Sequence, residues 1–253
     1  SFIGAEVAAS LCEMGLDVTM VFPESRLLEK IVPEELSTFL KAKYEKRGVR
    51  ILTGTKPEQL EGDNRVQRAN LSNHETLDVD LVVMGVGVRL NTELAKDAGL
   101  QLDGSDAVIV DETLRTSDPD IYAAGDIAAW PDPTFKTRLR VEHWDVARGQ
   151  GLQAGRNMAG KQEAYTALPY FFSDLFDFSF EVWGNFNVWD RAVLQGSLEA
   201  DSFMVFYFNQ GSMVGVLAVN PSDASRDAIP QLIQQRPAYQ DVTDQLSKGE
   251  LAM

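Results

Sequence analysis

The chain has 253 residues, of which 44% are hydrophobic and 24% charged, a globular composition that excludes intrinsic disorder. Its 38 acidic and 23 basic residues give a net charge of −15, which argues against nucleic acid and anionic membranes as partners. The single cysteine, Cys12, excludes an internal disulfide, a CxxC redox pair and a thiolate metal cluster, and the two histidines leave little for a histidine-based metal site. No apolar run reaches the length of a membrane span, and the first residues lack a basic signal region, so we expect a cytoplasmic protein.

The first 22 residues predict a helix followed by a strand. Apolar residues recur at helical spacing over 1–14, and Gly15 stands where a helix C-cap is expected. The β-branched run 17–22 then predicts a strand, so the pair is the second half of a βαβ unit. In a GxGxxG turn Gly4 would be the last glycine, and Glu24 has the offset of the acidic residue that binds the adenosine ribose. A glycine that only allows close helix–strand packing explains Gly4 equally well.

The next elements continue an alternating α/β pattern. An amphipathic helix is predicted over 31–47, closed by a glycine, and a short strand over 49–52. Residues 65–72 and 75–78 are typical of a β-hairpin, and the unbroken apolar run 81–87 predicts a buried parallel strand. Residues 1–84 therefore resemble a nucleotide-binding domain that lacks its first strand.

Residues 113–127 carry the strongest signal for a binding site. The segment combines a turn, a short buried strand and a terminal Gly125-Asp126. A glycine lets the backbone approach a ligand closely, and a carboxylate at the end of a strand can accept hydrogen bonds from ribose or ribityl hydroxyls. The alternative is that Asp126 caps the next segment.

Several motifs in this order resemble the FAD-dependent pyridine nucleotide oxidoreductases, in particular their ferredoxin reductase, rubredoxin reductase and apoptosis-inducing-factor branch. The motifs are FIGAE at 2–6, IYAAGDIA at 121–128, VEHWDVA at 141–147 and PYFFSD at 169–174. The resemblance covers essentially the whole chain.

The resemblance implies a two-dinucleotide-binding, Rossmann-like α/β flavoprotein fold with a C-terminal α+β antiparallel-sheet domain. It divides the chain into an NAD(P)-binding domain (1–84), the returning half of an FAD-binding domain (85–165) and a C-terminal interface domain (166–253). The family's N-terminal FAD-binding unit has no counterpart here, so we expect a fragment of a longer flavoprotein that retains FAD poorly by itself.

Residue roles for the nicotinamide cofactor follow from the resemblance. Gly4 is expected to admit the pyrophosphate to the helix N-terminus, and Glu6 to face the nicotinamide as a catalytic residue. Glu6 is otherwise a first-turn acid that the helix dipole favours. Glu24 favours NADH, whereas the nearby Arg26 would favour the phosphate of NADPH. Gly87 is expected to border the cofactors, although a plain crossover explains it almost as well.

The resemblance assigns a second group of residues to FAD. Asp126, with Gly125, is expected to hold the ribityl and pyrophosphate region. The segment beside the isoalloxazine contributes Glu142, His143, Trp144 and, from further along, Phe172. Trp144 is the second expected catalytic residue because it offers the flavin a flat wall. His143 either tunes flavin protonation or caps a helix, and Trp144 and Phe172 are otherwise core aromatics.

The last third is predicted to form an antiparallel sheet with a helical end. Strands are expected at 180–184, 191–198, 202–208 and 212–219, with a hairpin turn at Gln210-Gly211. Asn220-Pro221 is expected to cap the following helix, and Pro230 to kink it or to mark a second start.

The functional prediction is an FAD-dependent NAD(P)H oxidoreductase that uses NADH, with NADPH second. It is expected to pass electrons to a ferredoxin, rubredoxin or Rieske-type centre or to a small-molecule acceptor. A homodimer is a possible assembly. The alternatives are an NADH oxidase or monodehydroascorbate reductase and a redox-sensing interaction protein like the apoptosis-inducing factor. One basic cluster either docks the partner or is solvated surface, and it consists of Lys136, Arg138, Arg140 and Arg148.

Overall fold

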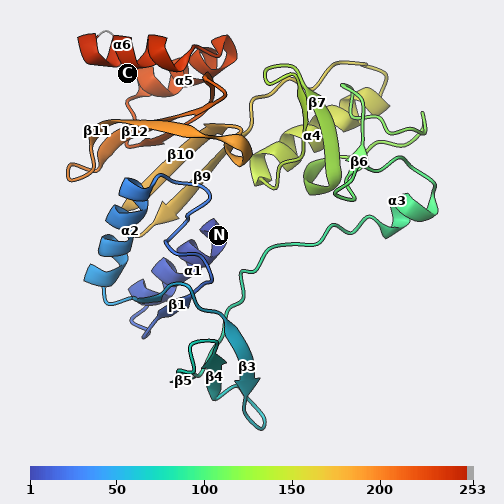
Figure 1. Ribbon diagram of the computed structural model, residues 1–253. Helices are drawn as coiled ribbons and strands as arrows, with labels where there is room; N and C mark the ends of the chain where they lie inside the picture. Colours follow the sequence, from blue (N-terminus) through green and yellow to red (C-terminus); the bar gives the residue numbers. More distant parts are fainter. Residues whose placement is uncertain (250–253) are drawn as a thin grey trace. The chain divides into compact units, whose positions relative to one another are not determined.

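The computed structural model describes residues 1–249, with only the backbone described at Asn187. The chain divides into two compact units (Figure 1). Unit 1 contains Ser1–Gly87, Ser173–Phe180 and Gly196–Ser202, whereas unit 2 contains Val88–Phe172, Glu181–Gln195 and Phe203–Met253. Unit 1 therefore joins the start of the chain to two short segments that come much later in the sequence.

Unit 1 begins with alternating helices and strands: α1 (Phe2–Glu13), β1 (Thr19–Val21), α2 (Glu34–Lys46) and β2 (Arg50–Leu52). The two strands are parallel neighbours, as the predicted βαβ pattern requires. The buried face of α1 consists of Ala5, Ala8 and Ala9, whose small side chains let the helix approach its neighbours closely. Gly15 follows the helix with a φ of +84°, which confirms the predicted C-cap.

α2 is amphipathic, as its spacing predicts, but it begins three residues later than expected. Pro33 precedes its first turn and fixes an extended backbone there, so the helix begins at Glu34. Leu36, Leu40 and Tyr44 recur every four residues and are almost fully buried. They form the core of unit 1 together with the alanines of α1.

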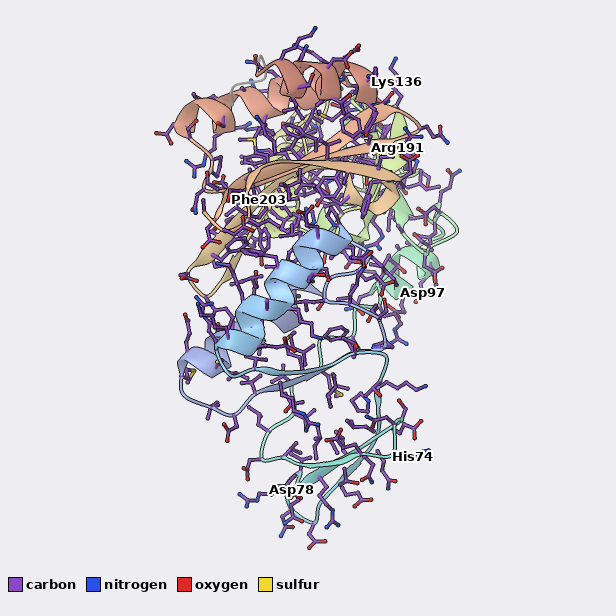
Figure 2. The ribbon with its side chains drawn as sticks, turned by 60° about the vertical axis from the view of Figure 1, so that its left-hand side comes forward. His74, Asp78, Asp97, Lys136, Arg191 and Phe203 are labelled. Atoms are coloured by element: carbon purple, nitrogen blue, oxygen red, sulfur yellow. The ribbon has the colours of Figure 1, made fainter. Side chains whose placement is uncertain are left out.

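A small antiparallel sheet of β3 (Pro57–Glu61), β4 (Arg68–Leu71) and β5 (Thr76–Asp78) follows. The β4–β5 hairpin confirms the prediction for this stretch, whereas β3 was not expected. Figure 2 shows His74 and Asp78 on this hairpin, and both residues are exposed.

The predicted buried strand over 81–87 is wrong. The segment is extended but pairs with no strand, and no backbone–backbone hydrogen bond holds it among the described residues. Its apolar side chains are exposed: Val83 by 53%, Met84 by 72% and Val86 by 88%. A run of apolar residues indicates that a segment can be buried. A strand forms only when a neighbouring backbone is present to pair with it.

The first part of unit 2 contains α3 (Glu93–Asp97), β6 (Val108–Ile109), the short 3₁₀ helix η1 (Gly125–Ile127), β7 (Ala128–Asp132), β8 (Thr137–Leu139) and α4 (Trp144–Met158). β7 is the centre of a three-stranded sheet, parallel to β6 and antiparallel to β8. Trp130 on β7 is completely buried and meets Tyr165 edge to face. The strand expected just before Gly125 is absent, because only an isolated bridge between Arg115 and Tyr122 forms there.

A five-stranded antiparallel sheet dominates the last third of the chain. Its strands are β9 (Tyr170–Leu175), β10 (Phe178–Gly184), β11 (Arg191–Ser197), β12 (Ser202–Asn209) and β13 (Ser212–Val219). The spatial order is β11-β12-β13-β10-β9, so β13 lies at the centre. The four predicted strands and the turn at Gln210-Gly211 are confirmed, and β9 is an addition. Figure 2 shows Phe203 of β12 among densely packed side chains.

Two helices end the described chain, α5 (Asp223–Gln235) and α6 (Tyr239–Lys248), with the short 3₁₀ helix η2 (Phe186–Val188) lying earlier, between β10 and β11. The predicted cap at Asn220-Pro221 is wrong, because Ser222 caps α5 through a hydrogen bond from the Ser225 amide. Asn220 instead adopts a φ of +50° as the chain leaves β13. Pro230 lies inside α5 and does not mark a second start.

Candidate cofactor-binding site

The predicted site residues form two groups, one in each unit. In unit 1, Gly4 and Glu6 lie near the start of α1. The Ser1 hydroxyl accepts a hydrogen bond from the Gly4 amide at 3.2 Å and so caps the helix. The same hydroxyl donates to the Gly85 carbonyl, which brings the 85–87 segment to this helix end. A Cβ on Gly4 would meet only Ser1 Oγ within 4 Å, so the glycine keeps the helix N-terminus accessible.

Gly87 adopts a φ of +99°, a conformation that favours glycine. A Cβ there would meet no atom within 4 Å. The glycine is therefore required by the backbone conformation in the described chain, and its predicted contact with the cofactors stays a prediction.

Glu6 is half-buried on α1, and its carboxylate accepts a hydrogen bond from the Ser173 hydroxyl at 2.6 Å. Both residues belong to unit 1, although 167 positions separate them in the sequence. The sequence offers no signal for this pair, since only the folded chain brings β9 to α1.

Glu24 and Arg26, the two residues expected to select the nicotinamide cofactor, differ in availability. The Arg26 guanidinium donates to the carbonyls of Val32 at 2.8 Å and Glu29 at 3.1 Å. The half-buried Glu24 carboxylate makes no hydrogen bond or ion pair within residues 1–249. The arginine is therefore used to hold the 26–32 turn, and the carboxylate is available to a ligand.

The group in unit 2 centres on the turn at Gly125. Gly125 adopts a φ of +78°, and a Cβ there would lie 3.3 Å from the Cβ of Ala147 on α4. The Gly125 amide donates to Gln150 Oε1 at 2.8 Å, and Gln150 is completely buried. This contact joins the turn to α4. Gln150 was not predicted as a site residue, although a polar residue on the buried face of α4 is a signal that could have identified it.

Asp126 is exposed in η1, and no partner for its carboxylate is present in the described part of the chain. The alternative that Asp126 caps the next segment is wrong, because no side-chain cap forms there and a strand follows. Arg140 donates to the Asp126 carbonyl and also pairs with the Glu142 carboxylate at 2.7 Å. Arg140 thus holds Glu142 beside the turn. Arg140 was not predicted as a cofactor-binding residue.

His143 immediately precedes α4 but does not cap it through its side chain. Its ring packs against Phe171 with 4.3 Å between centroids, and its Nδ1 is buried with no hydrogen-bond partner in residues 1–249. Burial lowers the pKa of His143 to about 4, although the charge of the Glu142 carboxylate acts in the opposite direction. The imidazole is therefore neutral at physiological pH. His143 does occupy the N-cap position of α4, where its carbonyl accepts from the Ala147 amide, but its side chain makes no capping hydrogen bond.

Trp144 and Phe172 are exposed aromatic rings, so the alternative that they are core residues is wrong. Trp144 is 73% exposed and Phe172 57%. The Arg148 guanidinium lies over the Trp144 ring at 5.6 Å. The two exposed rings offer flat apolar faces, against which a planar ring system could stack.

The predicted basic cluster is partly engaged within the chain. Arg138 donates to the carbonyls of Val110 and Ala129, and Arg140 and Arg148 make the contacts given above. Lys136 is exposed. Fewer of its basic side chains are therefore available to dock a partner than the sequence indicates.

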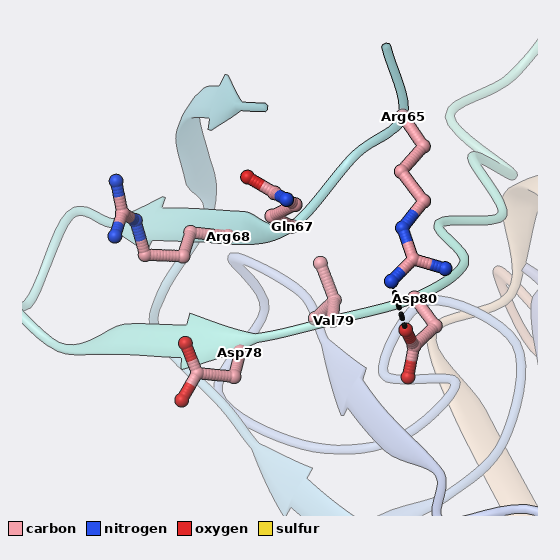
Figure 3. Close-up of a pocket in the computed structure, with 6 residues that line it drawn as sticks. All are labelled: Arg65, Gln67, Arg68, Asp78, Val79 and Asp80. Atoms are coloured by element: carbon pink, nitrogen blue, oxygen red, sulfur yellow. Dashed lines mark ion pairs between the residues drawn. The ribbon is translucent and has the colours of Figure 1, made fainter. Parts of the chain in front are cut away.

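A surface hollow of about 330 Å³ lies elsewhere, on the β4–β5 hairpin (Figure 3). Its lining includes the exposed ion pair of Arg65 and Asp80, whose charged atoms lie 3.9 Å apart. None of the predicted site residues lines it, and its charges are solvated, so the geometry of the two residue groups is the better guide to the site. Among residues 1–249, no cluster of His, Cys, Asp and Glu is suited to hold a metal ion. No helix in the same range is long and apolar enough to cross a membrane.

Comparison with known proteins gives two family matches. Residues 1–151 match the model described as pyridine nucleotide-disulphide oxidoreductase, and residues 170–245 match the one described as reductase C-terminal.

Individual relatives include reductases of two kinds. The ferredoxin–NAD(+) reductase component of the anthranilate 1,2-dioxygenase system of Burkholderia cepacia is 33% identical over 87% of this chain and 54% of its own length. A monodehydroascorbate reductase of Pisum sativum is 31% identical over 98% of this chain and 59% of its own. The crystal structure of the ferredoxin reductase for the CYP199A2 system from Rhodopseudomonas palustris superimposes with a TM-score of 0.85 at 31% identity, covering 99% of this chain and 63% of that one. The chain thus spans little more than half the length of these curated relatives.

Proposed function

The chain belongs to the pyridine nucleotide-disulphide oxidoreductase family, and we propose that it forms part of an NADH-dependent FAD oxidoreductase that passes electrons to a one-electron acceptor. The observation that carries the proposal is the turn at Gly125. There a glycine with positive φ is joined to α4 through the buried Gln150, and the neighbouring Asp126 carboxylate has no partner among the described residues. An acidic side chain beside an accessible backbone turn fits the hydroxyls of a ribityl or ribose group.

The residues at the start of α4 fit a flavin ring. Trp144 and Phe172 offer exposed aromatic surface, and Glu142 is held close by Arg140. His143 Nδ1 and Gln150 Nε2 are buried polar atoms without a partner in the described residues. Such atoms cost free energy unless a ligand or water satisfies them. When bound, the flavin supplies the hydride acceptor for the nicotinamide; Trp144 and Phe172 would exclude water from the ring, and the neutral His143 would carry no charge to it.

The start of α1 fits the pyrophosphate of a dinucleotide. The helix N-terminus carries a partial positive charge, and Gly4 leaves room for a ligand to approach. Glu6, one turn into the helix, is proposed to contact the nicotinamide side. Gly87, two residues after the Gly85 that Ser1 contacts at this helix end, is proposed to border the cofactors.

NADH is the preferred donor in this proposal. The available Glu24 carboxylate accepts from a ribose 2′-hydroxyl and repels a 2′-phosphate, and Arg26 is engaged by backbone carbonyls. Glu24→Gln is expected to lower the ratio of kcat/KM for NADH over that for NADPH by about 10-fold. An unchanged ratio would remove Glu24 from the specificity site.

A ferredoxin-type protein is the proposed acceptor, supported by the reductase components among the relatives. A second candidate is monodehydroascorbate, because the Pisum sativum enzyme aligns over nearly the whole chain. Turnover with each acceptor under the same NADH concentration separates the two. The acidic C-terminal third disfavours an acidic ferredoxin on that surface, since like charges repel.

In this proposal, residues 1–84 bind NAD(P), residues 85–165 contribute part of the FAD site, and residues 166–253 form an interface domain. A cytoplasmic location is also proposed, supported by the free thiol of Cys12. Whether the protein forms a homodimer can be measured by sedimentation.

The first experiment is an absorbance spectrum of the protein with FAD, followed by an anaerobic NADH titration. Added FAD is expected to bind with low affinity, since poor retention is predicted from the sequence, and the bound flavin is expected to bleach with NADH. Asp126→Ala should weaken FAD binding by about 10-fold, since a charge-assisted hydrogen bond is lost. Asp120→Ala is the matched control, because Asp120 is another exposed aspartate of the same segment. A protein that binds no FAD even at saturating concentration, and so does not respond to NADH, would overturn the proposal.

A further inference from the structure

The hydrogen bond between Ser173 and Glu6 joins two distant parts of the sequence within unit 1. Ser173 lies on β9 and is only 1% exposed, and its hydroxyl donates to Glu6 Oε1 at 2.6 Å. No other hydrogen bond or ion pair reaches the Glu6 carboxylate among residues 1–249. Hydrogen bonds to ionised groups are about twice as strong as neutral ones, so Ser173 is the main restraint on the carboxylate.

Ser173 belongs to the β9–β10 hairpin, and the tip of this hairpin packs against α2. Phe176 meets the Tyr44 ring with 4.9 Å between centroids, and Asp177 forms an ion pair with Arg47. Phe178 packs against Phe39. These contacts leave the Ser173 backbone little freedom, so its hydroxyl is a fixed donor.

Tyr44, whose hydroxyl feels the charge of Glu6, does not compete with Ser173 for the Glu6 carboxylate. Its OH donates to the Ala5 carbonyl at 2.8 Å. Burial, and then the negative charge of Glu6, hold the pKa of Tyr44 well above its ordinary value. Tyr44 therefore stays neutral and supports the α1 backbone, whereas Ser173 contacts the carboxylate.

We propose that Ser173 is a positioning residue that holds the Glu6 carboxylate in one orientation toward the nicotinamide end of the bound dinucleotide. The inference rests on the proposed function for the role of Glu6, but the hydrogen bond itself does not. Glutamate has three rotatable side-chain bonds, and one buried donor selects among its rotamers before the cofactor binds. By this contact, a strand that matches the reductase C-terminal model sets the geometry of a residue at the start of the chain.

The test compares Ser173→Ala with Ser179→Ala. Ser179 is the matched control, because its hydroxyl also donates to a carboxylate of the same hairpin, that of Asp174 at 2.7 Å, but at an exposed place. The first readout needs no cofactor: infrared spectra of the protein carrying ¹³C-labelled glutamate, with the Glu6 band assigned by Glu6→Ala. Ser173→Ala is expected to shift and broaden that band, whereas Ser179→Ala leaves it in place.

The second readout is the rate of flavin reduction by NADH in the FAD-loaded protein. Ser173→Ala is expected to lower the limiting rate constant about 10-fold and to change the NADH dissociation constant less than about 2-fold. In a Glu6→Ala background the same change should have almost no effect, because the two residues act as a unit. Ser173→Thr, which keeps the hydroxyl, should restore part of the rate, and thermal unfolding verifies that each variant is folded.

The outcomes separate the two proposals. An unshifted Glu6 band in Ser173→Ala overturns the hydrogen bond, and an unchanged reduction rate overturns the positioning role. A wild-type protein that NADH does not reduce overturns the proposed function and the positioning role together, even if the infrared band shifts. A shifted band with a slower rate that depends on Glu6 supports both.

Discussion

Two apolar runs of the chain have nearly the same sequence character and opposite structures. Residues 81–87 read LVVMGVG, and β13 at 212–219 reads SMVGVLAV. The central side chains of β13, Val216 and Leu217, are completely buried, whereas Met84 and Val86 are 72% and 88% exposed. β13 lies between β12 and β10, which pair with both of its edges, but residues 81–87 pair with no strand.

The difference teaches that hydrophobicity alone does not make a strand. A strand is stable when neighbours satisfy its backbone amides and carbonyls and cover its side chains. The helix α5 packs against β13 and supplies part of that cover, and Ile229 and Ile233 of α5 are fully buried.

Hydrogen exchange gives the largest expected contrast between these runs. The amides of β13 should exchange slower than unprotected amides by roughly five orders of magnitude, because they open only with the sheet. Amides of residues 82–87 should exchange at nearly the rate of an unstructured peptide. Mass spectrometry of labelled fragments measures both. Strong protection in 82–87 would contradict the comparison, since it requires a hydrogen-bonding neighbour.

Glycines with similar backbone angles sharpen the comparison. Gly184, beside β13, has a φ of +102°, and a Cβ there would lie 2.3 Å from the Val214 carbonyl oxygen. Gly184→Ala should lower the free energy of unfolding by more than about 3 kcal/mol, because backbone must move. Gly87→Ala, at a φ of +99° but in open space, should cost about 1 kcal/mol. Denaturant unfolding measures both, and equal costs would show that the angle dominates over the contact.

Truncation of a side chain tests burial directly. Leu217→Ala should lower the free energy of unfolding by about 3 kcal/mol, since a fully buried leucine leaves a cavity. Met84→Ala should change it by less than about 0.5 kcal/mol, because most of the side chain already contacts water. The same denaturation experiment applies, and a large loss in Met84→Ala would mean that the segment is covered in solution.

Acid titration tests the effect of burial on an ionisable group. Burial lowers the pKa of His143 to about 4 from an ordinary value of 6.5, so between these pH values the unfolded chain binds a proton that the folded chain does not. The free energy of unfolding should therefore fall by about 2 kcal/mol as the pH drops from 6.5 to 4.

His143→Gln should remove that part of the pH dependence. His74→Gln is the control for loss of a histidine at an exposed turn. A pH dependence that survives in His143→Gln would assign the effect to other groups.

Much of the local structure was predictable because it depends on neighbours along the chain. The spacing of Leu36, Leu40 and Tyr44 determines α2, and the turn at Gln210-Gly211 sets the β12–β13 hairpin. The start of α5 was predicted two residues early, because Ser222 is the better cap once Asn220 adopts a positive φ. Asp126 and Trp144 were identified from their motifs, but their availability and exposure became known only from the fold.

By itself, the sequence determined the alternation of helices and strands, the antiparallel C-terminal sheet and the resemblance to a flavoprotein family, since each depends on short-range patterns. Only the tertiary structure decided that 81–87 pairs with no strand, that Arg26 is engaged by carbonyls, that Gln150 supports Gly125 and that Ser173 contacts Glu6. These are contacts between side chains and backbone whose partners are set by packing in space, and spacing along the chain does not encode them.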